Sequence, residues 1–223
     1  MKKLIVAGVI SCVLMLGAAS SATATGTSAS ASNWHVGIYN ASGRALSQTQ
    51  ASASPSGVAA FQFTTTPDVA LLTTSQGSQK GALLGDITGK TVTAQFTITG
   101  TGPFSYYGQG TPSNPCGTPA SVRLYFQTSN AGGFDPANYW WSNPGGSQVL
   151  VVSGSTVTVT APVSPSQWSD WNGQTGTVAH DGFVAAAAHV TDIGLSFGGG
   201  CFFENGVGAP DATFTLISYT VVS

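Results

Sequence analysis

Apolar and polar residues alternate along much of this chain. The clearest case is the segment 90–99, where every second side chain is apolar and mostly threonines lie between: Val92, Ala94, Phe96 and Ile98. The segment 121–127 repeats the pattern, with Val122, Leu124 and Phe126 on one face and Arg123 and Tyr125 on the other. Because a period of two places successive side chains on opposite faces of a strand, both segments are predicted to be β-strands over a hydrophobic core.

Other segments are rich in β-branched and aromatic residues and are bounded by turn-forming residues, which is typical of strands. They cover residues 34–39, 58–63, 193–197 and 213–222. Residues 148–152 and 155–160 are predicted to form a hairpin around Ser153-Gly154. The stretch 40–57, rich in Ser, Ala and Gln, is predicted to be a loop.

Helical signals are almost absent from the sequence. Only the Ala-rich stretch 182–190 favours a helix, and Asp181 before it is expected to be the N-cap. About ten short strands, glycine and proline turns and one short helix predict an all-β, single-domain jelly-roll β-sandwich.

The first residues have the three-part pattern of a secretory signal peptide. Lys2 and Lys3 precede an apolar run over 4–19, and Ala22-Thr23-Ala24 supplies the small residues of a cleavage site. The run is shorter than the roughly 20 residues that cross a bilayer, which argues against a membrane anchor. We therefore expect a signal peptide at 1–24, a flexible low-complexity lead at 25–32 and a β-sandwich domain at 33–223, secreted from a bacterial cell to the extracellular space.

Charged residues make up only 6% of the chain, against about 25% in an ordinary soluble domain. Without residues 1–24, four basic residues stand against eight acidic ones, a net charge of −4: Arg44, Lys80, Lys90 and Arg123. Four scattered cations cannot form a basic patch, so neither nucleic acid nor an anionic membrane surface is an expected partner. The surface must be covered by hydroxyl and amide side chains, which suit neutral ligands.

Cysteine usage points to an oxidising compartment. Cys12 lies in the predicted signal peptide, which leaves Cys116 and Cys201 as a pair. Such a pair in a secreted protein is predicted to form a disulfide, which here would stabilise the fold by about 4 kcal/mol. The alternative is a metal-binding or catalytic thiol, but no histidine lies near either cysteine in sequence.

The later part of the chain, residues 80–222, resembles the galactose-binding-like jelly-roll β-sandwiches, a class that includes many carbohydrate-binding modules. The resemblance rests on the entry into a core strand at 86–96, on Trp168 before the segment 183–189, and on the strands 190–197 and 213–221. It implies a β-sandwich fold. Where many such modules have an acidic pair in the last strand, this sequence has Ile217-Ser218, and no acidic cluster marks the structural calcium that many of them hold.

The sequence also resembles, more narrowly, secreted actinobacterial proteins of unassigned function. It rests on the blocks 139–144 and 198–206, which combine consecutive aromatic residues with turn residues. This kinship implies no function.

Two turn-rich segments, 134–144 and 168–173, hold four of the five tryptophans. Exposed Trp and Tyr rings stack on the apolar faces of sugars, while Asp, Asn and Gln bind the hydroxyl groups. The candidate ligand-binding residues are Asp135, Asn138, Tyr139, Trp140, Trp141, Trp168, Asp170, Trp171 and Glu204. Alternatively, all these aromatic residues plug the ends of the sandwich. Trp140 and Trp141 are consecutive, so at least one is expected in the core. A second aromatic turn, Tyr106-Tyr107, is interpreted as a strand end and a loop.

Catalysis has weaker support in the sequence. Glu204 is the single glutamate of the chain, and Asp135, Asp170 and Asp181 are its candidate acid/base partners. Glycoside hydrolysis takes two carboxylates roughly 5–10 Å apart, a distance that sequence does not give. The three histidines lack metal-ligand spacing, and no motif indicates a cofactor: His35, His180 and His189.

Three hypotheses follow. The first is a secreted non-catalytic module that binds neutral carbohydrate or cell-wall polysaccharide through loop aromatics. The second is a structural or cell-surface-associated protein without a small-molecule ligand. The third is a small secreted glycoside hydrolase. Burial of the tryptophans separates the first two, and a cleft with two carboxylates is required by the third. The sequence leaves the oligomeric state open.

Overall fold

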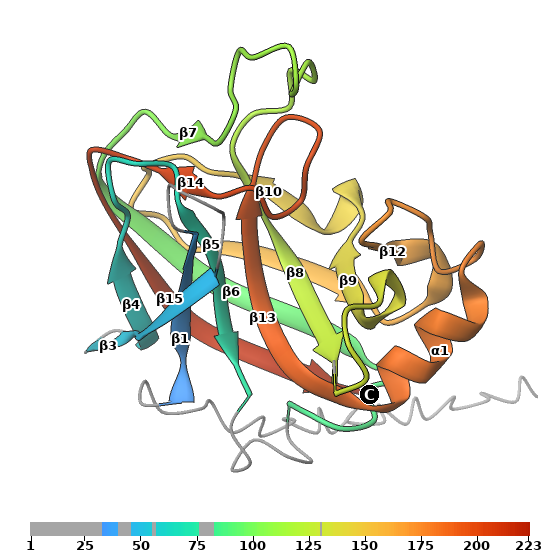
Figure 1. The fold of residues 1–223 in the computed structure, drawn as a ribbon. Coiled ribbons are helices and arrows are strands. Elements are labelled where there is room, and N and C mark those ends of the chain that lie inside the picture. Colours follow the sequence, from blue (N-terminus) through green and yellow to red (C-terminus); the bar gives the residue numbers. More distant parts are fainter. Residues whose placement is uncertain (1–32, 40–45, 55–56, 76–82, 130) are drawn as a thin grey trace, which may run out of the picture.

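The computed structural model describes residues 33–39, 46–54, 57–75, 83–129 and 131–223. The predicted signal peptide (1–24) and low-complexity lead (25–32) lie outside the described residues. In the described part of the chain, two antiparallel sheets face each other and one short α-helix lies at one end (Figure 1). The predicted all-β sandwich with one short helix is confirmed.

The larger sheet, sheet A, faces the viewer in Figure 1 and has the strand order β12-β9-β8-β13-β5-β1-β2. In chain order, these strands are β1 (His35–Tyr39), β2 (Leu46–Gln50), β5 (Val69–Thr74), β8 (Ser121–Thr128), β9 (Tyr139–Ser142), β12 (Trp168–Asp170) and β13 (Val190–Gly198). Three short strands pair at its margins: β7 (Ser105–Tyr106), β10 (Ser147–Val149) and β14 (Val207–Gly208).

Sheet B lies behind sheet A in Figure 1 and has the order β11-β6-β15-β4-β3. Its strands are β3 (Ser52–Ser54), β4 (Gly57–Gln62), β6 (Thr91–Thr101), β11 (Val157–Pro162) and β15 (Asp211–Val222). The long strands β6 and β15 pair along almost their whole length and form its centre.

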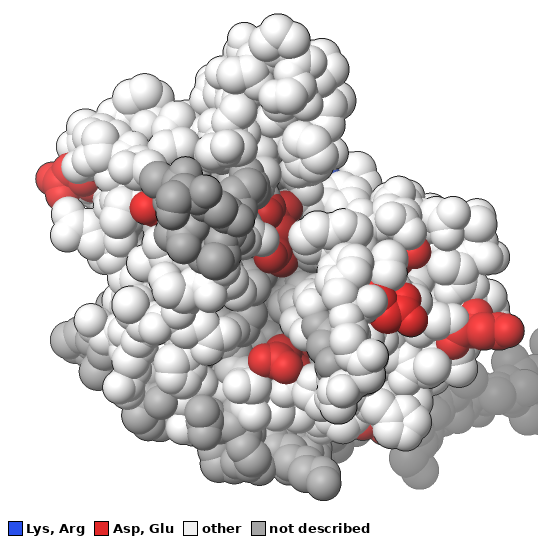
Figure 2. Space-filling view, viewed as in Figure 1, with Lys and Arg blue, Asp and Glu red and all other residues white. Residues whose placement is uncertain are grey.

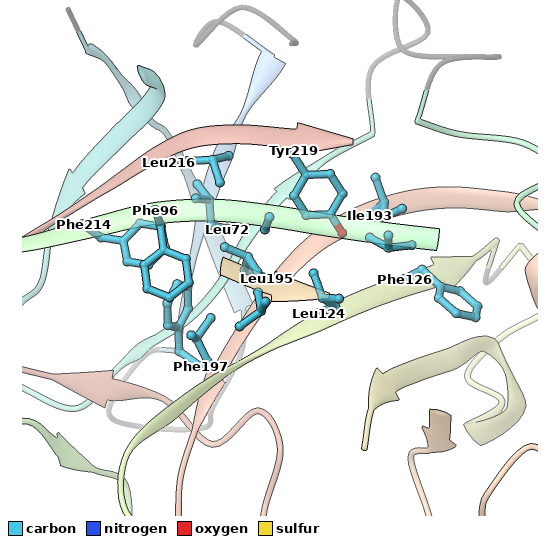
Figure 3. Close-up of a cluster of buried hydrophobic side chains, with 14 of the residues drawn as sticks. Leu72, Phe96, Leu124, Phe126, Ile193, Leu195, Phe197, Phe214, Leu216 and Tyr219 are labelled. Carbon is cyan, nitrogen blue, oxygen red and sulfur yellow. The ribbon is translucent and has the colours of Figure 1, made fainter. Parts of the chain in front are cut away.

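The main core lies between the sheets and is built from the predicted alternation (Figure 3). From Val92 to Ile98 in β6, every second residue is buried, as predicted. In β8, the face predicted to be apolar contributes Leu124 and Phe126 to this core. The Phe214 ring stacks on Phe96 and packs edge-to-face with Phe197. Burying a large apolar side chain contributes about 1.5–3 kcal/mol, so this layer holds the two sheets together.

The helix α1 (His180–Ala188) buries Phe183, Ala186 and Ala187 against the core. It begins earlier than predicted, because the Phe183 N–H already donates to the Ala179 carbonyl at 3.0 Å. The N-cap is therefore Ala179, and the prediction of Asp181 as the cap is wrong. Asp181 lies in the first turn, exposed to solvent beside His180.

The predicted hairpin around Ser153-Gly154 is also wrong. β10 pairs with β8 of sheet A, whereas β11 pairs with β6 of sheet B. The connection crosses from one sheet to the other, and the backbone N–H groups of Ser153 and Gly154 both donate to the Ile98 carbonyl. Each segment thus pairs with a longer strand, and the two partner strands belong to different sheets.

Some strands were not predicted from the pattern of apolar and polar residues. β2 and β3 lie inside the stretch 40–57 that was predicted as a loop. β5 was missed because it is buried on both faces and shows no alternation. This strand lies between β1 and β13 in sheet A, and its outward side chains form part of the floor beneath the site described next.

Candidate binding site

The two consecutive tryptophans of β9 point to opposite faces of sheet A. Trp140 is fully buried in the main core, where its Nε1 donates to the Ala137 carbonyl at 2.7 Å. Trp141 belongs to a second, smaller cluster with Ala70, Leu71 and Tyr125 on the outer face of sheet A. The expectation that at least one of the pair lies in the core is confirmed, and both are buried.

Trp168 and Trp171 differ in burial. Trp168 is fully buried, packs on Phe126 with ring centroids 4.8 Å apart, and donates from Nε1 to the Pro162 carbonyl. Trp171, directly after β12, is 47% exposed. Of these two candidates, only Trp171 has a ring that a ligand can reach.

The polar side chains predicted to bind a ligand in these loops instead make hydrogen bonds to nearby backbone groups. Asp170 is buried, and its Oδ1 accepts from the N–H groups of Asn172 and Gln174 at 2.9 and 2.8 Å, which fixes the turn that carries Trp171. The Asp135 Oδ1 accepts from the Ala137 N–H and caps a short 3-10 helix, η3 (Pro136–Asn138). Asn138 donates to the Ser129 carbonyl at 3.3 Å.

Five aromatic side chains form an unbroken line of ring contacts, which we call the aromatic strip: Phe134, Tyr139, Trp171, Trp141 and Phe203. Successive ring centroids along it lie 5.5, 5.6, 5.8 and 5.9 Å apart. Phe134 is 61% exposed at one end. The strip begins in the loop before β9 and ends in the loop after β13, so it crosses the outer face of sheet A.

A second wall is formed by the loops 107–118 and 199–206, which the predicted disulfide between Cys116 and Cys201 joins. Two buried amides bind these loops together. Asn114 accepts from the Cys201 N–H at 2.8 Å, and Asn205 donates to the Tyr107 carbonyl at 2.8 Å. This wall presents Tyr107 and Phe202, which are 49% and 53% exposed.

Glycine is required where the two loops meet. Gly200 has a φ of +67°, and a Cβ there would lie 2.1 Å from the Asn114 Oδ1. Any other residue would therefore push the two loops apart.

Between the aromatic strip and this wall lies a pocket of about 720 Å³, which we call the outer-face pocket. Figure 2 shows the hollow running down this face of the molecule. Its lining combines aromatic rings with amides and one carboxyl group: Tyr39, Tyr107, Trp141, Trp171, Phe202, Phe203, Asn114, Asn172, Asn205 and Glu204.

Glu204 is fixed within this pocket. The Tyr39 hydroxyl, at the end of β1, donates to the Glu204 Oε1 at 2.7 Å. Tyr125 lies beneath, and burial first and the negative charge of Glu204 second hold the pKa of its phenol well above the usual value. The side chain of Glu204 thus brings a carboxyl group to a largely aromatic lining.

Arg123 supports the pocket from behind. Its guanidinium lies 4.4 Å from the centre of the Phe203 ring, and its Nη1 donates to the Ser142 carbonyl at 3.2 Å. Burial lowers the pKa of Arg123 to about 10. Among the described residues it makes no ion pair, and it is not part of the lining.

The structure thus brings Trp141, Trp171 and Glu204 together in one pocket. Tyr139 adjoins them through Trp171, whereas Trp140 and Trp168 lie in the core. The sequence analysis missed Tyr39, Asn114, Phe202, Phe203 and Asn205, and it interpreted Tyr107 as part of a loop only. The aromatic block beside Cys201 was the available signal for two of them.

Two further observations bear on chemistry and location. Within the described ranges, no three His, Cys, Asp or Glu side chains are grouped so that they could hold a metal ion. No helix in the described part of the chain is long and apolar enough to cross a membrane.

No protein-family model matches this sequence, and no curated protein matches it either. Among solved structures, the chain is similar to a xylan-binding module, CBM15, with 12% sequence identity and a TM-score of 0.36. The alignment covers 83% of this chain and 92% of that one. A similarity of this degree says nothing of what this chain binds.

Proposed function

We propose that this chain is a secreted, non-catalytic module that binds a neutral polysaccharide in the outer-face pocket. The observation that carries the proposal is the position of Trp171. Its half-exposed indole lies in the pocket lining together with the amides of Asn114 and Asn205 and the carboxyl group of Glu204. Secretion rests on the pattern of residues 1–24 and is supported by the disulfide.

The exposed aromatic side chains of the described surface support a ligand rather than a solely structural role. Phe134, Tyr107, Trp171 and Phe202 are each about half exposed or more, and all four belong to the aromatic strip or the pocket lining. Large apolar side chains that gather at one hollow commonly mark a binding site. Trp and Tyr rings bury apolar area against the face of a sugar, while a few polar groups orient its hydroxyls.

The aromatic strip favours a polymer over a single sugar. A sugar ring is similar in size to one aromatic ring, whereas the strip holds five rings in continuous contact, of which Phe134 and Trp171 are about half exposed or more. An extended glycan could therefore contact several rings at once and add their contributions.

The structural hypothesis explains Trp140 and Trp168, which plug the sandwich, but leaves Trp171 without a role. The hydrolase hypothesis expected Glu204 to work with Asp135, Asp170 or Asp181. None of these three lines the pocket beside Glu204, and Asp170 and Asp135 are engaged with backbone N–H groups. The binding-module proposal accounts for more of the observed arrangement.

Affinity electrophoresis and pull-down on insoluble polysaccharides and cell walls test the proposal. The purified chain without residues 1–24 is compared with a Trp171→Ala, Tyr107→Ala variant and with Val178→Ala, an exposed apolar control outside the pocket. We expect the wild type and the control to bind at least one neutral polymer and the double variant to lose that binding while remaining folded. Absence of binding to any polymer, or equal binding by all three proteins, would leave the structural hypothesis as the better account. Soluble sugars released during the assay would instead indicate a hydrolase.

A further inference from the structure

We infer that the outer-face pocket recognises a pair of unsubstituted hydroxyl groups on neighbouring carbon atoms of a sugar ring, and that the side chain of Asn172 binds them. The inference rests on the proposed function. It adds the residue that determines specificity and the chemical feature that the bound glycan must carry.

Trp171 and Asn172 share the tip of one tight turn. The Gly173 N–H donates to the Asp170 carbonyl at 2.9 Å, which closes a four-residue β-turn with Trp171 and Asn172 at its two central positions. Both side chains are exposed, and both residues belong to the lining of the outer-face pocket. A sugar ring that stacks on the Trp171 indole therefore lies beside the Asn172 amide.

The backbone of this turn is fixed from below by Asp170, which is buried at the end of β12. Its Oδ1 accepts from the N–H groups of Asn172 and Gln174, and its own N–H donates to the Gln174 carbonyl at 2.8 Å. These bonds use only backbone atoms of Asn172 and leave its side chain available. A group on a backbone that is already ordered loses less entropy when it binds a ligand.

Three amide side chains line the described pocket, those of Asn114, Asn172 and Asn205. In Asn114 and Asn205, both the oxygen and the nitrogen bind backbone groups of the two loops that form the second wall. The Asn172 side chain, in contrast, makes no hydrogen bond to any residue that the structure describes. Of these three amides, Asn172 is thus the one with a donor and an acceptor left for a ligand.

The chemistry of an amide suits two adjacent hydroxyl groups. The Asn172 Oδ1 accepts a hydrogen bond and its Nδ2 donates one, while a hydroxyl group can do either. Two hydroxyls on neighbouring ring carbons can therefore bind both ends of one amide at once. They lie at the rim of a sugar ring whose face packs on an indole.

Substitution of these hydroxyls should be detected by the same amide. A methyl ether has no proton to donate to the Asn172 Oδ1, and its methyl group occupies the space of the hydrogen bond. A site that hydrogen-bonds a ligand hydroxyl discriminates against an analogue that lacks it, because the polar group of the protein is then left without a partner.

Neutral polymers with free and with substituted hydroxyls test the inference. Arabinoxylan, glucomannan and mixed-linkage glucan, each alongside its O-methylated derivative, are compared by affinity electrophoresis with the wild type, Asn172→Ala and Gln174→Ala. Gln174 is the matched control because it is an exposed amide of the same turn, donates from its backbone N–H to the same Asp170 oxygen, and is not part of the pocket lining. Both substitutions keep the backbone bonds to Asp170, and circular dichroism with thermal denaturation confirms that each variant is folded.

We expect the wild type to bind at least one free polymer about tenfold more tightly than its O-methylated form. Asn172→Ala should bind that free polymer about tenfold more weakly than the wild type and the methylated form about equally well, so that the discrimination disappears. Gln174→Ala should match the wild type on both forms.

Three results overturn the inference and leave the proposed function standing: equal binding of free and methylated polymer by the wild type, wild-type discrimination in Asn172→Ala, or the same loss in both variants. Failure of the wild type to bind any of the free polymers counts against the proposed function, and against the inference with it.

Discussion

The Tyr39 hydroxyl donates a 2.7 Å hydrogen bond to the Glu204 Oε1 across 165 positions of sequence. Tyr39 ends β1, and its backbone N–H is itself fixed by the Asp68 carbonyl at 2.8 Å. The first strand of sheet A thereby sets the position of the carboxyl group that the loop after β13 brings to the pocket. This bond links the core of the sandwich to the candidate site.

Replacing Tyr39 by Phe tests that link. The substitution removes one hydrogen bond to a carboxylate, which is worth about 1.5–3 kcal/mol, and leaves Glu204 less well oriented. We expect the affinity for the bound polymer to fall roughly tenfold. Tyr219→Phe is the matched control, because that hydroxyl donates to the Gly194 carbonyl inside the core. It should cost about 1 kcal/mol of stability and leave binding unchanged. Wild-type binding by Tyr39→Phe would contradict the role given to this pair.

The two tryptophans at either end of β12 should respond oppositely to truncation. Trp171→Ala removes a half-exposed ring, so we expect the free energy of unfolding to fall by less than about 1 kcal/mol while polysaccharide binding is lost. Trp168→Ala empties a fully buried site and should cost about 3–5 kcal/mol. Chemical denaturation and affinity electrophoresis measure the two effects. A strongly destabilised Trp171→Ala would mean that its ring is chiefly structural.

Removal of the disulfide should affect both stability and binding. Cys116→Ser together with Cys201→Ser opens a link across 85 positions and is expected to cost about 2–5 kcal/mol. The wall that carries Tyr107 and Phe202 then depends on hydrogen bonds alone, those of the Asn114 and Asn205 amides and those between the backbones of the two loops, so affinity should also fall. Binding is measured at a temperature where the variant is still folded. Unchanged affinity there would show that these hydrogen bonds suffice to hold the wall.

Alkaline titration should distinguish the two fully buried tyrosines, Tyr125 and Tyr219, from the others by the pH at which their phenols ionise. Burial raises the pKa of Tyr125 and of Tyr219 well above 10, which means that the folded state favours the protonated phenol. This contribution to stability is present below pH 10 and is lost as the pH rises through the raised pKa values in the folded state. In a titration followed by phenolate absorbance, two of the six tyrosines should ionise only when the protein unfolds. Ionisation of all six near pH 10 in the folded protein would refute the burial of these two phenols.

The sequence predicted much of the core because a strand that is buried on one face has apolar residues at every second position. The alternation of 90–99 identified β6 and its buried face, and that of 121–127 identified β8 and the face that it turns to the main core, although β8 is buried on both faces. The same rule placed Trp140 and Trp141 on opposite faces of β9. It failed for β5, which is buried on both faces, and for the expected hairpin, whose two segments pair in different sheets.

The candidate site was predictable only in part. Aromatic residues in turn-rich segments pointed to Trp141 and Trp171, the single glutamate pointed to Glu204, and cysteine pairing correctly predicted the disulfide. The same composition could not separate Trp168 from Trp171, which lie three positions apart and differ completely in exposure. Asp135 and Asp170 also looked like ligand-binding residues, but both bind backbone N–H groups in their own turns.

The sequence by itself determined the class of fold, the low charge and the pairing of Cys116 with Cys201, because these follow from local periodicity, composition and the count of cysteines. The tertiary structure alone decided which side chains meet in the outer-face pocket. Tyr39, Tyr107, Trp171 and Glu204 come from four separate segments, and their meeting depends on the order of strands in sheet A. Strand order is set by long-range pairing and burial, which leave no local mark in the chain.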